Sequence, residues 1–394
     1  MEQAIKIKPD IYYVGSLDRT RKHFDSFYPV KKGTSYNSYL IIGKEKTALI
    51  DTIDPSKKDD LLSKLESLGI KKIDYIISNH SEQDHSGSIP FVLEKYPMAK
   101  IVTNSKGKDF LSDLLGIKEN LFIVVENRKT LDLGGRTLTF LSFPWAHWPE
   151  TMMTYLNEEK MLFSCDMFGS HYASDDLFYD NDELYEYVEQ YYAEIMMPFR
   201  NVISKNFDIL KDFDIEMILP SHGPIHKNPK KIISLYEKYL SDNVENEVTI
   251  IYLSMHGSTE VAVEFLSQKL KENNIKVNLV DVSGMNISGL LRAMISPLTV
   301  ILATPTVMGN PHPAMQLVSI ILKEYRPKLK NMAFLAMYEW GTRAIEMMEA
   351  TCSDLGKTNL GSLKIKGYPK NTDFAKLENL AYSVINNHKE YFKR

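Results

Sequence analysis

Residues 79–87 read NHSEQDHSG and bring two histidines and two acids together directly after an apolar segment. Imidazole and carboxylate groups are common protein ligands of iron, manganese and zinc. In an extended segment, His80, Glu82 and Asp84 share one side, whereas His85 points elsewhere. We therefore expect this loop to serve two adjacent metal ions, with His80 and Glu82 on one and Asp84 and His85 on the other.

Three further metal-ligand candidates each follow an apolar run. They are His147 after LTFLSFPWA, Asp166 at the end of MLFSCD, and His222 after EMILPS. Polar residues beyond strand ends can meet at one rim, so we expect all three to join the 80–85 loop, with Asp166 as the natural bridge between two metals. Four imidazoles with three carboxylates suit iron or manganese and redox chemistry better than a histidine-rich zinc site does.

Glu82 is the residue that discriminates between two chemistries. The loop is one residue away from HxHxDH, the metal motif of metallo-β-lactamase hydrolases, which has histidine where Glu82 stands. An additional carboxylate offsets more metal charge and favours a higher oxidation state. The glutamate therefore favours a redox centre, and a metallohydrolase is the alternative.

Other residues whose side chains could take part in chemistry have simpler interpretations. Three histidines in polar sequence are expected on the surface: His23, His226 and His388. His171 is a candidate for the wall of the metal site, and Cys165 is expected to be packed because its neighbours are apolar. The Tyr-rich stretch 184–199 is expected to be a packed helix, with Tyr192 near the metal pocket as an alternative.

The C-terminal part contains three loops that could bind a flavin. SMHGST (254–259) combines hydroxyls and a glycine with the start of a helix, which is typical of a phosphate cradle. TPTVMGNPHP (304–313) suits the border of a planar ring, and YEWGTR (338–343) offers aromatic rings for stacking. Neither a Walker A nor a GxGxxG motif occurs in the sequence, so FMN is favoured over a nucleoside triphosphate or a dinucleotide. The expected FMN contacts are Ser254, Met255, His256, Gly257, Ser258, Thr259, Thr304, Pro305, Thr306, Val307, Met308, Gly309, Asn310, Pro311, Tyr338, Glu339, Trp340 and Gly341.

The elements that must position these residues change in pattern near residue 245. Before it, short apolar runs alternate irregularly with helical segments, as in an α+β or two-sheet sandwich. After it, five apolar strands each precede a helix, which predicts a doubly wound parallel sheet. We therefore expect two domains, 1–245 and 246–394.

Length and composition limit the class of protein. The 394 residues include 47 basic and 51 acidic side chains, for a net charge of −4, which gives no reason to expect nucleic acid or an anionic membrane as partner. The N-terminus lacks an apolar signal region and no long apolar run follows, so a cytoplasmic location is expected. Two cysteines are too few for a cysteine-ligated metal site.

The whole chain resembles the flavodiiron proteins, also called A-type flavoproteins. The resemblance rests on NHSEQDHSGS, PWAHWPETM, LFSCDMFG, YYAEIMMPF and LPSHGPI. It implies a metallo-β-lactamase-like αββα sandwich with two non-haem irons, followed by a flavodoxin-like domain with a five-stranded parallel sheet and FMN. It also implies that His80, Glu82 and His147 bind one iron, that Asp84, His85 and His222 bind the other, and that Asp166 bridges them. The His85 position is not a ligand in every family member, and family members often differ at His256, at 307–309 and at His226.

The resemblance implies an oxidoreductase that reduces O₂ to water, NO to N₂O, or both. Electrons would pass through FMN from a donor such as rubredoxin, a reduced deazaflavin or another reductase. A head-to-tail homodimer is expected, with one subunit's FMN at the other's diiron site, and a dimer of dimers is a further option. A hydrolase with an accessory flavodoxin-like domain, and an electron carrier with a vestigial metal site, are the alternatives. The sequence sets no preference between O₂ and NO.

Overall fold

The computed structural model describes residues 3–393, and the chain forms two compact units, Met1–Leu240 and Ser241–Arg394. The expected boundary between residues 245 and 246 lies at the start of a strand that belongs wholly to the second unit. Among the described residues, none of the helices has the length and apolar character needed to cross a bilayer.

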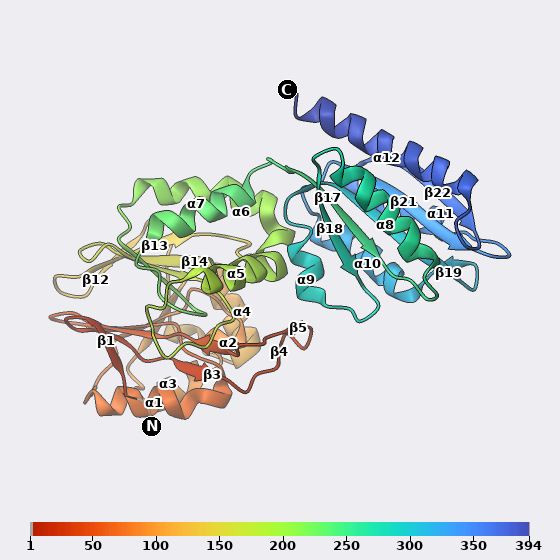
Figure 1. The fold of residues 1–394 in the computed structure, drawn as a ribbon. Helices are drawn as coiled ribbons and strands as arrows, with labels where there is room; N and C mark the ends of the chain where they lie inside the picture. Colours follow the sequence, from red (N-terminus) through yellow and green to blue (C-terminus); the bar gives the residue numbers. More distant parts are fainter. Residues whose placement is uncertain (1–2, 394) are drawn as a thin grey trace. The chain divides into compact units, whose positions relative to one another are not determined.

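The first unit is a sandwich of two mixed sheets (Figure 1). In spatial order, one sheet contains β1 (Ile5–Lys8), β2 (Ile11–Tyr13), β7 (Tyr39–Ile42), β8 (Thr47–Ile50), β9 (Tyr75–Ile77), β10 (Lys100–Thr103) and β11 (Phe122–Val124). The other contains β12 (Thr130–Asp132), β13 (Thr137–Ser142), β14 (Met152–Leu156), β15 (Met161–Cys165) and β16 (Met217–Pro220). Two smaller antiparallel pairs are β3 (Ser16–Asp18) with β6 (Thr34–Tyr36) and β4 (His23–Phe24) with β5 (Tyr28–Pro29).

The α-helices of the first unit lie outside its two sheets. They are α1 (Lys58–Ser67), α2 (Gln83–Ser86), α3 (Ile89–Lys95), α4 (Ser105–Leu115), α5 (Asp182–Tyr191), α6 (Arg200–Phe207) and α7 (Pro229–Leu240). In Figure 1, α1 and α3 lie below the first sheet and α6 and α7 lie above the second. The Tyr-rich stretch therefore begins as the expected helix, α5, but continues as a π-helical turn over Tyr192–Met196.

The core of the first unit lies between its two sheets. Tyr39 and Ile41 of β7 share one buried cluster with Leu138 and Phe140 of β13. These residues alternate along their strands, because successive strand side chains point to opposite faces. The apolar faces of the two sheets therefore pack against each other, and the strand ends at the sheet edges lead into polar loops.

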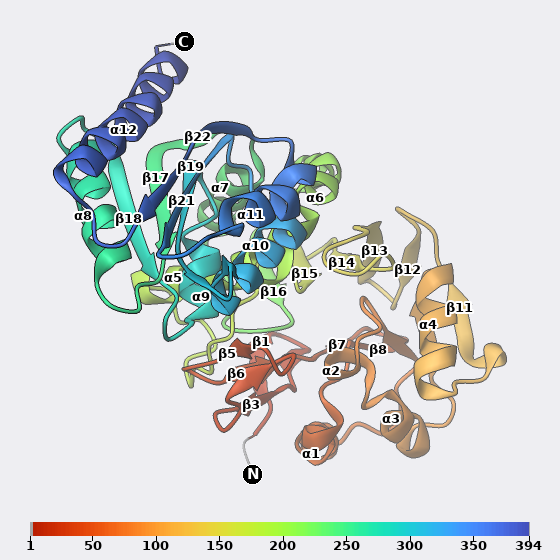
Figure 2. The ribbon, with the colours of Figure 1, turned by 90° about the vertical axis from the view of Figure 1, so that its right-hand side faces the viewer.

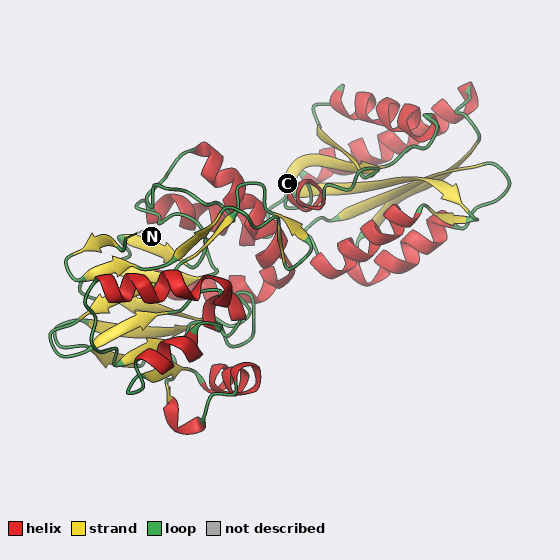
Figure 3. Ribbon diagram, turned by 90° about the horizontal axis from the view of Figure 1, so that it is seen from below, coloured by secondary structure: helices red, strands yellow, loops and turns green. Residues whose placement is uncertain are grey.

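The second unit is a doubly wound parallel sheet, as predicted. Its strands lie in the order β18 (Lys276–Asp281), β17 (Glu245–Tyr252), β19 (Pro297–Val307), β21 (Asn331–Tyr338) and β22 (Thr358–Lys366), and β20 (Asn310–Pro311) pairs with β19. The helices are α8 (Ser258–Lys271), α9 (Ile287–Arg292), α10 (Pro313–Tyr325), α11 (Ala344–Cys352) and α12 (Asn371–Tyr391). Helices α8 and α12 pack together, as do α10 and α11, and Figures 2 and 3 show helices on both faces of the sheet. This strand order is that of flavodoxin-like folds.

Two histidines that were expected on the surface are buried, so that prediction was wrong. His226 is 3% exposed and its Nε2 lies 2.8 Å from a main-chain carbonyl. His388 is 2% exposed, between Oδ1 of Asn246 at 2.8 Å and Oγ1 of Thr299 at 3.0 Å. Hydrogen bonding allows both imidazoles to be buried despite their polar sequence neighbours. His23 is exposed, as expected.

Candidate metal centre and flavin site

Strand ends bring the predicted metal ligands to one place. His80 follows β9, and His147 follows β13. β15 and β16 are parallel and Cys165 pairs with Pro220, so Asp166 and His222 leave the second sheet at the same edge. The carboxyl ends of neighbouring parallel strands meet at one edge of a sheet, which explains this convergence.

The 80–85 loop changes conformation in its middle. Glu82 has extended backbone angles, φ −60° and ψ 145°, but helix α2 begins at Gln83. The expectation of a continuous extended segment through Asp84 was therefore wrong. The helical turn redirects the chain, and Asp84 and His85 consequently join a different group from His80.

The first group contains His80, Glu82, His147 and Asp166, whose ligand atoms all lie within 4.8 Å of one another. Oε2 of Glu82 lies 3.2 Å from Nε2 of His80 and 3.1 Å from Nε2 of His147. Oδ2 of Asp166 lies 3.6 Å and 3.5 Å from the same two nitrogens. The structure thus brings together one set of two imidazoles and two carboxylates.

The second group contains Asp84, His85 and His222. Nε2 of His85 lies 3.3 Å from Oδ1 of Asp84, and Nε2 of His222 lies 3.1 Å from Oδ2 of the same carboxylate. Oδ1 of Asp166 faces both imidazoles, at 3.2 Å and 3.4 Å. Asp166 therefore points one oxygen at each group, as a bridging carboxylate does.

The residues fit a pair of metal ions. Five buried ligand atoms have no hydrogen-bond partner among the described residues: Oδ1 and Oδ2 of Asp84, Nε2 of His85, Oδ2 of Asp166 and Nε2 of His222. A buried polar atom without a partner is costly, so each needs a ligand that the polypeptide does not provide. Metal–ligand bonds of about 2.0–2.2 Å place neighbouring ligand atoms about 2.8–3.6 Å apart, which matches the separations above.

The three predicted flavin loops also converge. A hollow of about 310 Å³ lies beyond the ends of β17, β19 and β21, where flavodoxin-like folds bind ligands. Its walls include eleven predicted residues: Ser254, Met255, His256, Ser258, Thr259, Pro305, Thr306, Tyr338, Glu339, Trp340 and Gly341. Sequence reasoning missed two further wall residues, Met337 and Gly367. Met337 belongs to a buried strand and Gly367 follows β22, so neither stands in a polar loop motif.

The start of α8 has the features of a phosphate cradle. Gly257 has φ +85°, and its N–H donates to Oγ of Ser254 across 3.0 Å. A Cβ at Gly257 would meet no atom within 4 Å, which leaves the loop open to a ligand. The N-terminus of a helix attracts anions through its dipole and its N–H groups.

Seven predicted flavin contacts do not line this hollow: Gly257, Thr304, Val307, Met308, Gly309, Asn310 and Pro311. Val307 pairs with Asn310 in a hairpin between β19 and β20. Both turn residues, Met308 and Gly309, have positive φ, as a two-residue hairpin turn requires. The hairpin stands beside the hollow, and Met308 is 83% exposed at its tip.

Comparison with known proteins identifies the family. A model described as ODP family beta lactamase matches residues 34–223. The coenzyme F420H₂ oxidase of Methanothermobacter marburgensis is 33% identical over 79% of this chain and 80% of its own. The nitric oxide reductase of Moorella thermoacetica is 32% identical over 89% of each chain. The rubredoxin oxygen:oxidoreductase of Desulfovibrio gigas is 28% identical, with a TM-score of 0.95 over 100% of both chains.

The chain belongs to the flavodiiron protein family. As a flavodiiron protein it is an oxidoreductase, and the relatives favour this function over the hydrolase alternative.

In this flavodiiron protein, residues that sequence reasoning missed bond the candidate ligands from outside. Nδ1 of His80 lies 2.7 Å from Oε1 of Glu150, which is 2% exposed. Nδ1 of His222 lies 2.7 Å from the Ser35 carbonyl. Such outer contacts fix the orientation and tautomer of ligating imidazoles. Glu150 stands inside PWAHWPETM, three residues after His147, and that proximity was the available signal.

A tyrosine also contacts the centre, but it is not the one considered from sequence. Tyr191 donates its hydroxyl hydrogen to Oδ1 of Asp166 across 3.0 Å, whereas Tyr192 donates to the Tyr239 carbonyl. The ring of His171 lies 5.4 Å from that of His222. His171 is therefore in the wall of the centre, and burial, followed by the charge of His222, holds its pKa well below the usual value.

Charges within the cluster oppose the effect of burial. Burial lowers the pKa of His80, but hydrogen bonds to two glutamates raise it well above its ordinary value. Burial likewise opposes a charge on His85, but the carboxylates of Asp166 and Asp84 raise its pKa to about 9. A metal ion would take the place of protons on these imidazoles.

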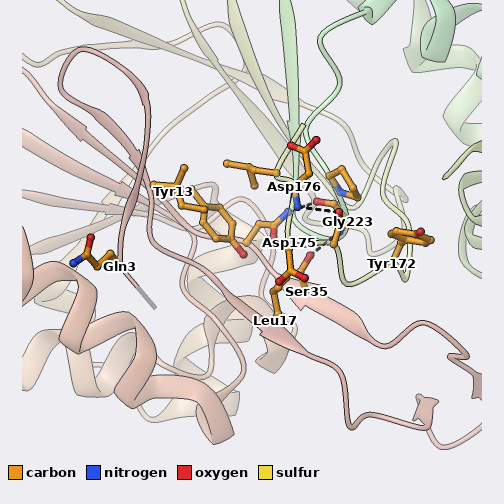
Figure 4. A pocket seen from close by; sticks show the side chains of 13 residues that line it. Gln3, Tyr13, Leu17, Ser35, Tyr172, Asp175, Asp176 and Gly223 are labelled. Atoms are coloured by element: carbon orange, nitrogen blue, oxygen red, sulfur yellow. Dashed lines mark hydrogen bonds between the residues drawn. The ribbon is translucent and has the colours of Figure 1, made fainter. Parts of the chain in front are cut away.

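A pocket of about 310 Å³ adjoins the His222 segment (Figure 4). Figure 4 shows Ser35 and Gly223 at its wall, and the Gly223 N–H donates to Oγ of Ser35 across 2.7 Å. Nδ2 of Asn37 donates to the carbonyls of Pro220 and Gly223 across 2.8 Å each. Residues in the wall of the pocket therefore hold the backbone on both sides of His222 through hydrogen bonds.

Proposed function

We propose that this flavodiiron protein binds two non-haem irons and one FMN and reduces O₂ to water, NO to N₂O, or both. The observation that supports this most is the pair of ligand groups that share Asp166, with five buried ligand atoms that lack a protein partner. The donor set of four imidazoles and three carboxylates suits iron better than zinc.

The iron ligands divide by geometry. His80, Glu82 and His147 would hold one iron, and Asp84, His85 and His222 the other, with Asp166 between them. When bound, two ferrous ions and reduced FMN supply four electrons, the number that takes O₂ to two waters, whereas reducing two NO to N₂O requires two. The protein contributes a fixed, buried set of donors and a hydroxyl, that of Tyr191, directed at the bridging carboxylate.

FMN would occupy the hollow beyond β17, β19 and β21. The Ser254–Thr259 loop would hold its phosphate, and Trp340 would stack on the ring system. Phosphate binding at the start of α8 needs no cation, because the helix N-terminus is itself electropositive.

The functional unit would be a head-to-tail homodimer, or a dimer of such dimers. Four large apolar side chains around the flavin hollow are exposed: Met255 at 50%, Met308 at 83%, Trp340 at 84% and Tyr368 at 59%. Contiguous exposed apolar groups mark interaction surfaces, and a second copy that buries them would bring its diiron site to this FMN. The electron donor would be a rubredoxin, a reduced deazaflavin or another reductase. The names of two relatives include rubredoxin and coenzyme F420H₂.

Anaerobic single-turnover experiments test this function. The fully reduced protein is mixed with O₂ or with NO, and flavin absorbance and products are followed. We expect a four-electron-reduced chain to consume one O₂ without releasing peroxide, or to convert NO to N₂O. A protein that stays reduced with both gases would overturn the proposal.

A further inference from the structure

The two ligand groups offer their metals matched sets of donors. Each provides two imidazoles, one carboxylate of its own and one oxygen of Asp166. The two groups therefore do not differ in the number or type of their ligands. A difference in redox potential between the two ions has to come from the residues that contact these ligands from outside.

A buried carboxylate supports the first group. Glu150 accepts the Nδ1–H of His80 at Oε1, across 2.7 Å, and the Ser81 N–H at the same oxygen, across 2.9 Å. Its Oε2 is buried without a hydrogen-bond partner, and no lysine or arginine pairs with Glu150 within residues 3–393. The negative charge of Glu150 therefore acts on His80 largely unscreened.

The second group has a neutral partner at the equivalent position. Nδ1 of His222 meets a main-chain carbonyl, that of Ser35, at 2.7 Å. Along the described chain, no carboxylate other than Asp84 and Asp166 lies within 4.0 Å of a ring nitrogen of His85 or His222. The charge of Asp51 faces both His85 and His80, but its oxygens bond Asn79 and neither ring. The imidazoles of this group therefore have no carboxylate bonded behind them as Glu150 is bonded behind His80.

Tyr191 adds to the difference in negative charge between the two groups. It donates to Oδ1 of Asp166, the oxygen that faces His85 and His222, and not to Oδ2, which faces the first group. A hydrogen bond into a carboxylate oxygen reduces the charge which that oxygen can offer a metal. The bridge therefore gives less electron density to the second metal than to the first.

We infer that the two irons differ in potential, and that the iron held by His80, Glu82 and His147 is the first to be oxidised and the ferric one in the mixed-valent state. A carboxylate behind a ligating imidazole raises its basicity and so favours the higher oxidation state. Glu150 and Tyr191 are positioning residues, because they act through His80 and Asp166. The inference rests on the proposed diiron function.

Redox titration of the iron-loaded protein, followed by the EPR signal of the mixed-valent state, tests this inference. Glu150→Gln removes the charge and keeps the shape, and Tyr191→Phe removes only a hydroxyl. We expect each to lower the stability constant of the mixed-valent state about tenfold, which is a narrowing of about 59 mV between the two one-electron potentials. Asp74→Asn is the matched control, because Asp74 is a buried carboxylate of the first unit that bonds Thr47 and Lys72 and not an imidazole.

The outcomes are distinguishable. If Glu150→Gln and Asp74→Asn change the separation between the two potentials by the same amount, Glu150 acts only as a buried charge and the inference is wrong. If Glu150→Gln fails to bind iron, Tyr191→Phe decides alone, and an unchanged separation contradicts the inference. A wild-type protein that holds zinc and no flavin would overturn the proposed function itself. If the wild type holds two irons and neither Glu150→Gln nor Tyr191→Phe changes the separation between the two potentials, only this inference is overturned.

Discussion

Oε2 of Glu82 lies 3.1 Å from Nε2 of His147 and 3.2 Å from Nε2 of His80, between the two imidazoles. The glutamate thus belongs to the first group of candidate ligands. Its neighbour Gln83 begins helix α2 and is exposed. The residue that separates this loop from a hydrolase motif is therefore a direct candidate for metal binding.

Glu82→His should change the metal. The substitution leaves two carboxylates for two ions and five imidazoles, a set that favours zinc over iron. We expect the purified variant to lose most of its iron, to gain zinc and to lose reductase activity, as measured by metal analysis and single-turnover assays. Gln83→His, which adds a histidine outside the ligand groups, should retain iron. Full iron content and full turnover in Glu82→His would show that this position does not select the metal.

Gly223→Ala should disturb the His222 segment. Gly223 has φ +80°, and a Cβ there would lie 2.1 Å from Oγ of Ser170. We expect a loss of about 2 kcal/mol or more in the free energy of unfolding, together with lower metal content. Gly116→Ala is the control, because Gly116 has φ +65° but no atom within 4 Å of a Cβ, and it should cost about 1 kcal/mol and no metal. Equal effects of the two substitutions would refute the steric explanation.

Trp340→Ala should weaken FMN binding. The indole lines the hollow and is 84% exposed without a ligand, so stacking is the contact it has to offer. We expect the dissociation constant of FMN, measured by flavin fluorescence on the apoprotein, to rise about tenfold. Met308→Ala is matched in exposure, at 83%, but lies on the hairpin outside the hollow, and it should leave affinity unchanged. A tenfold loss in both variants would assign the effect to surface apolarity and not to stacking.

The second unit should lose stability in mild acid through His388. Burial lowers the pKa of His388 to about 4, and both hydrogen-bond partners, Asn246 and Thr299, are uncharged. The unfolded chain takes up a proton below pH 6.5 while the folded unit does not, so the contribution is complete above that pH and is lost as pH falls toward 4. The loss is of the order of 3 kcal/mol.

Denaturant unfolding of wild type and His388→Gln between pH 7.5 and pH 5 measures this effect. The variant should show a shallower decline with acid than the wild type, because it cannot take up the proton. His23→Gln, which alters an exposed histidine, should follow the wild-type curve. Parallel curves for wild type and His388→Gln would exclude this histidine as the cause.

The sequence predicted those parts of the molecule that are set by local pattern. Short apolar runs interspersed with helical segments predicted the first architecture, and repeated β–α units predicted the second. Polar residues beyond strand ends predicted the convergence of His80, Asp166 and His222. The regular alternation of apolar strands and helices in the second unit made its parallel order predictable, because a helical crossover returns the chain to the same end of the sheet.

Contacts between distant segments could not be predicted in the same way. Glu150 and His80 are 70 residues apart, and only the packing of two sheets brings them together. The choice between Tyr191 and Tyr192 depends on helix phase, which the π-helical turn at Tyr192–Met196 shifts. His388 did have a signal: it continues the buried positions Leu377, Leu380, Ala381, Val384 and Ile385 of α12, spaced by three and four residues.

Metal and flavin content of the purified protein tests the central claim most directly. The chain is expressed with iron and zinc both available, and iron, zinc and FMN are quantified per chain by metal analysis and flavin absorbance. We predict two irons and one FMN per chain. Zinc in the ligand groups and no flavin would contradict the account.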